Sequence, residues 1–213
     1  MKKLYIFDFD GTISYTGDDI AVSLNEVRKR YGLEALGVSE VLKFVGYGAR
    51  FLIENTLNVP GEPLDKILEE YKASYFVHCC DTSVPYDGLA ETLDVIRERG
   101  DLAALFTNKP LKITVKTLDR FGIKDKFNSI YCPENLTKRK PDPEGIFRSM
   151  EDAGTDTAST VMVGDSKADI DAGRAAGVKT CGCLYGMGDR EKLLAAGPDC
   201  TVNDIREVAD LKL

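Results

Sequence analysis

Leu4-Tyr5-Ile6-Phe7-Asp8-Phe9-Asp10-Gly11-Thr12 is the stretch of the chain that decides its fold. The apolar run over residues 4–7 predicts a strand that is buried on both faces, as in a parallel sheet. Residues two apart on a strand point the same way, so Asp8 and Asp10 can share one pocket. Carboxylates at the end of a buried strand are costly unless a cation or hydrogen-bond donors surround them. Gly11 allows a sharp turn that leaves both acids at the carboxyl edge of the sheet, where open α/β folds bind ligands.

The rest of the chain divides into a helical block and an alternating block. Helical spacing of apolar residues over 18–31 is followed by predicted helices at 39–45, 49–57 and 63–78. From residue 85 onward, predicted strands and helices alternate, which is typical of a doubly wound, Rossmann-like parallel sheet in an α/β fold. The strands are expected at 102–107, 129–132, 160–163, 178–184 and 200–202, and the helices at 89–99, 111–121, 143–153, 168–176, after Asp189 and at the C-terminus.

The first predicted strand is separated from the others by the helical block. Because one strand cannot stand alone, residues 1–14 should return to the sheet built by residues 85–213, and together they form the α/β core. Residues 15–84 are then an inserted all-helical cap domain, in which no strand is expected. That geometry suits a lid over the strand ends that sets substrate specificity.

Composition narrows the classes of partner. The chain has 213 residues, with 43% hydrophobic and 30% charged, which is ordinary for a globular protein. Its net charge of -7 argues against nucleic acid as a partner, because phosphate backbones need a basic face. No segment approaches the ~20 apolar residues of a membrane span, and Asp8 and Asp10 interrupt the only stretch that resembles a secretory signal. We therefore expect a cytoplasmic protein without a membrane partner.

Six cysteines lack the density and spacing of a disulfide scaffold, and free buried thiols are the favoured interpretation over a zinc site.

Polar residues also follow other predicted strands. Thr107-Asn108 ends the strand that begins at residue 102, and Gly164-Asp165-Ser166 ends the strand that begins at residue 160. Asp169 follows near the start of a helix, and Lys140-Pro141 lies in the loop after the 129–132 strand. Any one of these groups is as readily a helix cap, but four such places at one sheet edge indicate a site.

Together these residues predict phosphoryl-transfer chemistry. Asp8, Asp165 and Asp169 form a hard oxygen cluster that suits Mg²⁺, which binds few carboxylates plus water and phosphate. Thr107 could donate a hydrogen bond to a phosphoryl oxygen, and Lys140 could neutralise its charge. A carboxylate nucleophile would form an aspartyl phosphate, and the second acid would protonate the leaving alcohol and later deprotonate water.

These motifs resemble the four ordered motifs of the haloacid dehalogenase superfamily: Asp8-x-Asp10-x-Thr12, Thr107-Asn108, Lys140-Pro141 and Gly164-Asp165-Ser166-x-x-Asp169. The resemblance covers essentially the whole chain, including a helical cap inserted after the first motif. It implies that Asp8 is the nucleophile and a Mg²⁺ ligand, and that Asp10 is the general acid/base and binds metal through its backbone carbonyl. Thr107, Asn108 and Lys140 would bind the phosphorylated substrate. Asp165 would ligate Mg²⁺, and Asp169 would support the metal or position Lys140.

The resemblance also favours one branch of the superfamily. The dehalogenases lack an acid at the position of Asp10, whereas the phosphatases and β-phosphoglucomutases keep it. Thr107-Asn108-Lys109-Pro110 and the stretch over 44–49 look like the phosphoglycolate phosphatase group, from which Ser14-Tyr15 departs. In the cap loop over 43–50, Arg50 and Lys43 are candidate partners for a substrate carboxylate or second phosphate. Solvent-exposed helix charges are an equally good interpretation of either.

The sequence therefore predicts a Mg²⁺-dependent phosphomonoesterase, with a small phosphorylated metabolite as its partner and 2-phosphoglycolate as the first substrate to test. Pyrophosphatase, nucleotidase, and phosphosugar phosphatase or β-phosphoglucomutase activities are the alternatives. A signalling receiver module also holds an aspartyl phosphate with acids, Mg²⁺, Thr and Lys, but the inserted cap and Asp10 disfavour it. The intact set of acids disfavours a silent binding protein. A monomer or a homodimer is expected.

Overall fold

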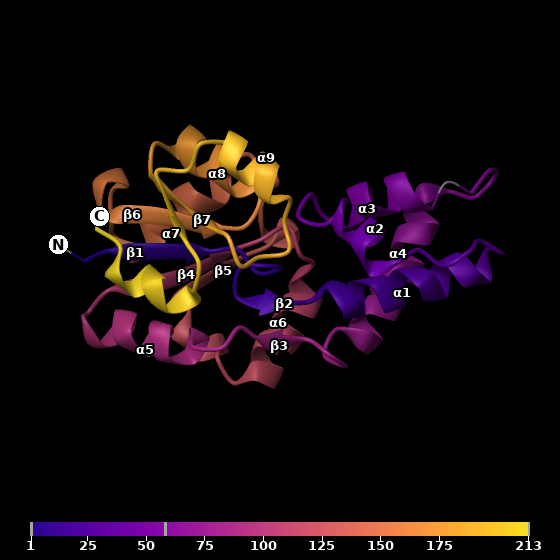
Figure 1. Cartoon of the computed structure of the whole chain (residues 1–213), viewed down its shortest axis with the longest axis horizontal. Helices are drawn as coiled ribbons and strands as arrows, with labels where there is room; N and C mark the ends of the chain where they lie inside the picture. The colour runs from indigo at the N-terminus through magenta and orange to yellow at the C-terminus, as the bar shows by residue number, and fades with distance from the viewer. Residues whose placement is uncertain (1, 58, 213) are drawn as a thin grey trace.

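A six-stranded parallel sheet forms the centre of the larger lobe in the computed structural model, which describes residues 2–57 and 59–212 (Figure 1). The strand order is β5-β4-β1-β6-β7-β8. Strand β1 therefore lies inside the sheet, and Phe7 is in register with Leu105 on one side and Val163 on the other. This confirms the predicted doubly wound α/β fold. The strands are β1 (Leu4–Phe7), β4 (Leu102–Phe106), β5 (Ser129–Tyr131), β6 (Thr160–Gly164), β7 (Lys179–Cys183) and β8 (Cys200–Val202).

Helices cover both faces of this sheet. Tyr5 and Phe7 pack in one apolar cluster with α5 and α6, whereas Leu4 and Ile6 pack in another with α7 and α8. The continuous apolar run of β1 thus follows from burial on both sides. The C-terminal helix is the short 3-10 helix η4 (Ile205–Asp210), which joins the first cluster. The α-helices of this lobe are α5 (Leu89–Glu98), α6 (Leu111–Phe121), α7 (Glu144–Ala153), α8 (Lys167–Ala176) and α9 (Arg190–Ala195).

Within residues 16–57 and 59–83, the structure shows four helices, which build the smaller lobe drawn at the right of Figure 1. Helices α1 and α4 lie against each other, and the lobe has its own apolar cluster, which includes Leu24, Ile53 and Tyr75. Ile113 of α6 also belongs to this cluster, so the helical lobe packs onto the sheet lobe at that point. The helices are α1 (Gly17–Arg30), α2 (Val38–Leu42), α3 (Ala49–Thr56) and α4 (Leu64–His78).

A small antiparallel ribbon joins the two lobes and corrects the expectation that residues 15–84 contain no strand. Strands β2 (Ser14–Tyr15) and β3 (Val84–Pro85) pair with Tyr15 opposite Val84. Two-residue strands are too short to produce a readable alternation of apolar and polar residues. The ribbon lies where the chain enters and leaves the helical lobe, at the two boundaries that the sequence suggests for the cap.

A buried carboxylate ties the same two crossings together. Asp19, in the first turn of α1, accepts hydrogen bonds from the backbone N–H and hydroxyl of Thr82 at 2.9 and 2.6 Å. Its other oxygen accepts the same pair of bonds from Ser83, also at 2.9 and 2.6 Å. Asp19 is 1% exposed, so these four donors satisfy a charge that water cannot reach. We call this arrangement the Asp19 clasp.

Asp19→Ala is expected to lower the free energy of unfolding by about 3 kcal/mol, because several buried donors lose their acceptor. For a chain of this size the loss corresponds to a fall in Tm of roughly 6–12 °C. Thermal unfolding followed by circular dichroism measures it. Asp18→Ala is the matched control, since no hydrogen bond or ion pair of the Asp18 side chain is present within residues 2–57 and 59–212. Equal effects of the two variants would contradict the role given to the clasp.

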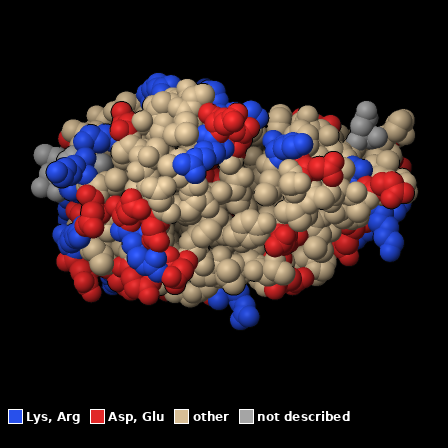
Figure 2. All heavy atoms as spheres, in the orientation of Figure 1, with Lys and Arg blue, Asp and Glu red and all other residues tan. Residues whose placement is uncertain are grey.

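Charged side chains of both signs are mixed on the face drawn in Figure 2, and lysines and arginines there lie among acidic neighbours. In the part of the chain that the structure describes, no helix combines the length and apolarity needed to cross a membrane.

Candidate active site

Three buried carboxylates meet at the carboxyl edge of the sheet. Asp8 follows β1, Asp165 follows β6, and Asp169 lies in the first turn of α8. One oxygen from each lies within 4.8 Å of the others. Parallel strands end at one edge, which brings residues more than 150 positions apart into this cluster, as the sequence predicts.

Lys140 neutralises part of the cluster. Its ammonium nitrogen lies 2.6 Å from Asp8 Oδ1 and 2.6 Å from Asp169 Oδ1, and its side chain is fully buried. Burial alone would lower the pKa of Lys140, but the charges of Asp169 and Asp8 raise it, so the side chain stays protonated. The second oxygen of Asp169 accepts hydrogen bonds from the backbone N–H and hydroxyl of Ser166 at 3.0 and 2.6 Å. Both oxygens of Asp169 are therefore engaged, an arrangement that favours positioning of Lys140.

Burial raises the pKa of Asp8 to about 6, and the charges of Asp169 and Asp10 add to the effect while Lys140 opposes it. Asp8 Oδ1 contacts Lys140 only as an ion pair and has no partner in hydrogen-bond geometry among the residues that the structure describes. A buried carboxylate oxygen that lacks a hydrogen-bond donor is suited to contact a further cation or an incoming electrophile.

Backbone donors and glycines cradle Asp165. Its Oδ2 accepts hydrogen bonds from the N–H groups of Met187 and Gly188, both at 2.8 Å. Gly11 has φ +83°, and a Cβ at that position would lie 1.9 Å from the same oxygen, so only glycine fits beside the carboxylate. Burial, with the charges of Asp169 and Asp8, raises the pKa of Asp165 well above its ordinary value.

The cluster fits a hard divalent cation. When ionised, three carboxylates and one ammonium leave a net negative charge in a buried site, which is costly without a counter-charge. The atoms of the cluster that could coordinate a metal ion are carboxylate oxygens, the ligand type that Mg²⁺ prefers. Asp8 Oδ1 lacks a hydrogen-bond partner among the described residues, and the pKa values of Asp8 and Asp165 are raised. Both observations indicate that the protein's own hydrogen-bond donors and cations do not balance the negative charge. The Asp10 side chain is not in the cluster, as expected if Asp10 meets a metal only through its backbone.

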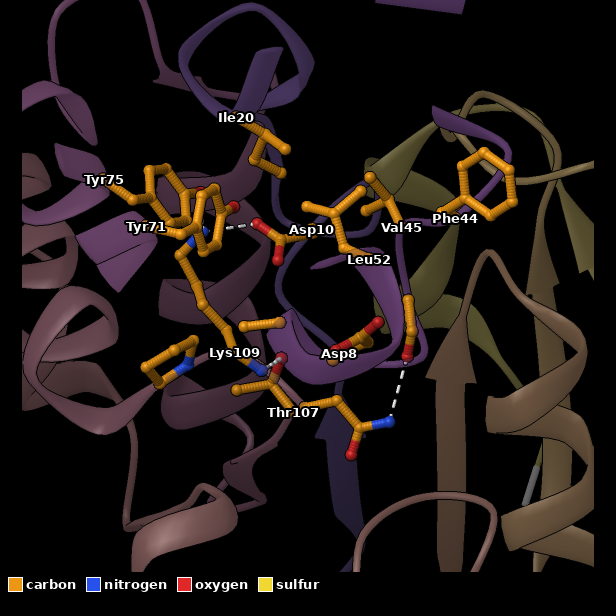
Figure 3. A pocket seen from close by; sticks show the side chains of 15 residues that line it. Asp8, Asp10, Ile20, Phe44, Val45, Leu52, Tyr71, Tyr75, Thr107 and Lys109 are labelled. Carbon is orange, nitrogen blue, oxygen red and sulfur yellow. Dashed lines mark hydrogen bonds and ion pairs between the residues drawn. The ribbon is translucent and has the colours of Figure 1, made fainter. Parts of the chain in front are cut away.

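Asp10 faces the same cavity as Asp8, and hydrogen-bond donors fix one of its two carboxylate oxygens (Figure 3). Its Oδ1 lies 2.6 Å from the ammonium nitrogen of Lys109 and 2.7 Å from the hydroxyl oxygen of Thr16. Lys109 also donates to the hydroxyl of Tyr75 on α4, and its side chain is 1% exposed. Sequence reasoning noted Lys109 only as part of a motif and gave it no role.

The cavity has a polar floor and an apolar roof. Asp8, Asp10 and Thr107 come from the sheet edge, and the side chains over them come from the helical lobe (Figure 3). Its volume is only about 30 Å³ in this conformation. Thr107 is 2% exposed and its hydroxyl oxygen accepts the Lys109 backbone N–H at 3.2 Å, which leaves the hydroxyl proton available to a ligand. The roof consists of Ile20, Phe44, Val45, Leu52, Tyr71 and Tyr75.

Asn108 also lines the cavity, but its amide serves the protein. The amide nitrogen donates to the backbone carbonyls of Gly46 at 2.9 Å and Lys140 at 3.1 Å. The amide oxygen accepts the Lys140 backbone N–H at 3.0 Å. The Asn108 side chain therefore holds the Lys140 loop and a loop of the helical lobe, and its contact with substrate stays a prediction.

The structure does not bring Arg50 to this cavity. Its guanidinium contacts the carboxylates of Asp65 and Glu54, and Arg50 is not among the described residues that line the cavity. Two carboxylates of the helical lobe pair with this guanidinium in the present conformation, and substrate binding by Arg50 stays a prediction. Lys43 lines a neighbouring crevice between the lobes, together with Ser166 and Lys192.

A family model described as "Haloacid dehalogenase-like hydrolase" matches residues 5–183, which include every carboxylate and lysine of this site. The chain belongs to the haloacid dehalogenase-like hydrolases. The resemblance predicted from the four motifs is thereby confirmed.

Curated relatives of this hydrolase cover nearly its whole length. The "Phosphoglycolate phosphatase" of Agrobacterium fabrum is 33% identical over 209 residues, which are 96% of this chain and 89% of the relative. The "N-acetylmuramic acid 6-phosphate phosphatase" of Pseudomonas aeruginosa is 31% identical over 212 residues, which are 98% of this chain and 94% of the relative. The enzyme is therefore similar to phosphatases with different named substrates.

Solved structures share the fold of this hydrolase. A protein from Haemophilus somnus, titled a predicted phosphoglycolate phosphatase, has a TM-score of 0.89 at 25% identity and covers 98% of this chain with 97% of its own. A haloacid dehalogenase-like hydrolase from Bacteroides fragilis has a TM-score of 0.89 at 20% identity, and the match covers 98% of this chain and 100% of the other. Both lobes therefore recur in known structures.

Proposed function

We propose that this hydrolase cleaves phosphomonoesters of small metabolites through a covalent phosphoryl group on Asp8, with 2-phosphoglycolate as the first candidate substrate. One observation carries the proposal: buried Asp8 lies 2.6 Å from Lys140 and opens onto a cavity that Asp10 also lines. A nucleophile, a cation for the phosphoryl charge and a second acid for proton transfer thus surround one space.

In the first step an oxygen of Asp8 attacks phosphorus and the bond from phosphorus to the substrate's ester oxygen breaks. Protonated Asp10 gives its proton to that oxygen, so the product leaves as a neutral alcohol. Lys140 and the hydroxyl of Thr107 hold the phosphoryl oxygens while negative charge moves onto them. Asp8 must be ionised to attack, and Lys140 beside it favours that state.

In the second step water attacks phosphorus, Asp10 takes the water proton, and the bond between phosphorus and Asp8 breaks. Inorganic phosphate leaves and the Asp8 carboxylate is restored. Asp8, Asp165 and the backbone carbonyl of Asp10 would hold Mg²⁺, with Asp169 supporting Lys140. The ion would offset carboxylate repulsion and the charge of the phosphate dianion.

The small cavity favours a small leaving group. Its volume of about 30 Å³ and its apolar roof leave little room above Asp10 in this conformation. The P. aeruginosa relative, named for a sugar phosphate, supports a phosphosugar as the second candidate. Hydrolysis rates for about two dozen phosphorylated metabolites with Mg²⁺ test the assignment, with a pyrophosphate, nucleotides and β-glucose 1-phosphate included. Absence of turnover of every phosphomonoester would reject the phosphatase.

The metal proposal predicts a pH-dependent stability. In EDTA, the folded protein must bury ionised Asp8 once the pH exceeds its pKa of about 6, whereas an unfolded chain ionises near 3.8. Stability therefore falls as the pH rises from 4 to 7, by about 2 kcal/mol in all, of which about 1 kcal/mol is lost above pH 5. Differential scanning calorimetry in EDTA at pH 5 and pH 7.5 measures this, and Mg²⁺ should restore more stability at pH 7.5.

Asp8→Asn is the control for this pH effect, because an amide cannot ionise. The variant should lose a large part of the difference in Tm between pH 5 and pH 7.5. An unchanged difference would show that other groups cause it, and an Mg²⁺ effect that is equal at both pH values would contradict binding by these carboxylates.

A further inference from the structure

We propose that Lys109, clamped by Tyr75 of the helical lobe, is the positioning residue that aims the Asp10 carboxylate at the leaving group. This inference rests on the proposed function and adds a role to it. Lys109 lies two residues beyond Thr107 at the end of β4, and its side chain runs under the cap to reach Asp10. Lys109 contacts Asp10, which transfers protons in the proposed reaction, whereas Lys140 binds the phosphoryl group.

The surroundings of the Lys109 ammonium leave it little freedom. It lies 2.6 Å from Asp10 Oδ1 and donates to the hydroxyl of Tyr75. It also lies over the rings of Phe9 and Tyr75, 4.9 and 4.5 Å from their centroids. With 1% of its side chain exposed, an ion pair and two aromatic faces hold the charge in place.

Lys109 and Thr16 occupy the same oxygen of Asp10. Both donate to Oδ1, at 2.6 and 2.7 Å, and no hydrogen bond to Oδ2 is present among the residues that the structure describes. Two donors on one oxygen fix the rotation of the carboxylate, so Oδ2 is the oxygen left to exchange a proton with the ester oxygen or with water. Figure 3 shows the second oxygen pointing away from Lys109.

Tyr75 makes this arrangement depend on the cap. Its hydroxyl contacts Lys109, its ring stacks on Tyr71 of the same helix with centroids 5.7 Å apart, and both tyrosines line the cavity. Asp10 and Lys109 come from the sheet lobe, whereas Tyr75 comes from α4. The clamp on Lys109 is therefore complete only when the helical lobe lies over the sheet edge as it does here, which joins cap position to acid position.

The test compares leaving groups. The full-length enzyme with Mg²⁺ is given 2-phosphoglycolate, whose alkoxide leaving group needs a proton, or p-nitrophenyl phosphate, whose leaving group needs none. In single turnover, Lys109→Met should slow phosphorylation of Asp8 by 2-phosphoglycolate about 100-fold, within the range of general acid catalysis. Phosphorylation by p-nitrophenyl phosphate should slow less than about threefold, since no proton transfer is required. Tyr75→Phe should show the same selectivity with a smaller loss, about threefold to tenfold.

Lys116→Met is the matched control, because Lys116 of α6 also donates to backbone carbonyls of α4 and lies over the ring of Phe76. It should leave both rates unchanged. The double variant Lys109→Met/Asp10→Asn should be no slower than Asp10→Asn alone, because Lys109 acts through Asp10.

Additive losses in the double variant would overturn the inference, as would a raised KM for 2-phosphoglycolate with unchanged kcat, which would make Lys109 a substrate ligand. Equal losses with both leaving groups in Tyr75→Phe and Lys109→Met would also overturn it, as would loss of folding in Lys109→Met with no selectivity in Tyr75→Phe. A parent enzyme that turns over no phosphomonoester of the metabolite panel would instead reject the proposed function; if another alkyl phosphate of the panel is the better substrate, it takes the place of 2-phosphoglycolate in this comparison.

Discussion

Asp8→Asn should reduce kcat for phosphomonoester hydrolysis by about 10⁴-fold or more, since the amide cannot attack phosphorus and no covalent intermediate can form. Steady-state rates with Mg²⁺ and 2-phosphoglycolate measure the loss. Intact-protein mass after acid quenching should reveal a phosphoryl group on the parent and none on the variant. Folding should survive, because Lys140 keeps Asp169 as a partner and a buried charge is removed.

The matched control for this variant is Asp87→Asn, the same change at a carboxylate that is 95% exposed and paired with Arg206. It should retain the parent's kcat. If Asp8→Asn kept more than about a hundredth of the activity, the covalent route through this residue would be wrong.

Asp10→Asn should slow turnover by about 10²–10⁴-fold, the usual range for loss of a general acid/base. Its defect should differ in kind from that of Asp8→Asn, because Asp8 can still attack a substrate with a good leaving group. With p-nitrophenyl phosphate, phosphorylation should remain fast while hydrolysis of the intermediate slows. Rapid quench followed by intact mass should then detect accumulated phosphoenzyme.

An Asp10→Asn variant as active as the parent would overturn the acid/base assignment. Failure of the phosphoenzyme to accumulate, with turnover still slow, would instead place the function of Asp10 before attack, in substrate binding or cap position. Asp18→Asn, a change on a half-buried acid of the same segment, is the control for local disturbance.

Much of the fold could be predicted from the sequence because it depends on long apolar patterns. The helix over 111–121 has the predicted bounds, since Pro110 precedes it and Gly122 ends it in a left-handed conformation with φ +68°. The parallel sheet follows from alternation of apolar runs with helices. The pair β2–β3 escaped prediction because two-residue strands leave no periodic signal.

The residues of the site also differ in how far the sequence predicts their positions. Asp8, Asp165 and Asp169 could be placed together because each ends or follows a parallel strand, so topology alone sets their meeting point. The contact of Lys109 with Tyr75, and the bonds of Asp19 to Thr82 and Ser83, join separate elements through single side chains. Such pairs carry no spacing rule in one sequence. The ion pairs of Arg50 show the same limit, because Glu54 lies at helical spacing in the sequence whereas Asp65, 15 positions away, does not.

The Asp19 clasp has a consequence for how this protein can be re-engineered. It fastens the start of α1 to the residues just before β3, and the β2–β3 ribbon pairs the chain on its way in with the chain on its way out. The clasp and the ribbon thus hold both ends of the insertion side by side. A different insertion whose ends are equally close should fit between them without pulling β1 out of the sheet, provided that it also supplies a hydroxyl in the place of Tyr75 to hold Lys109.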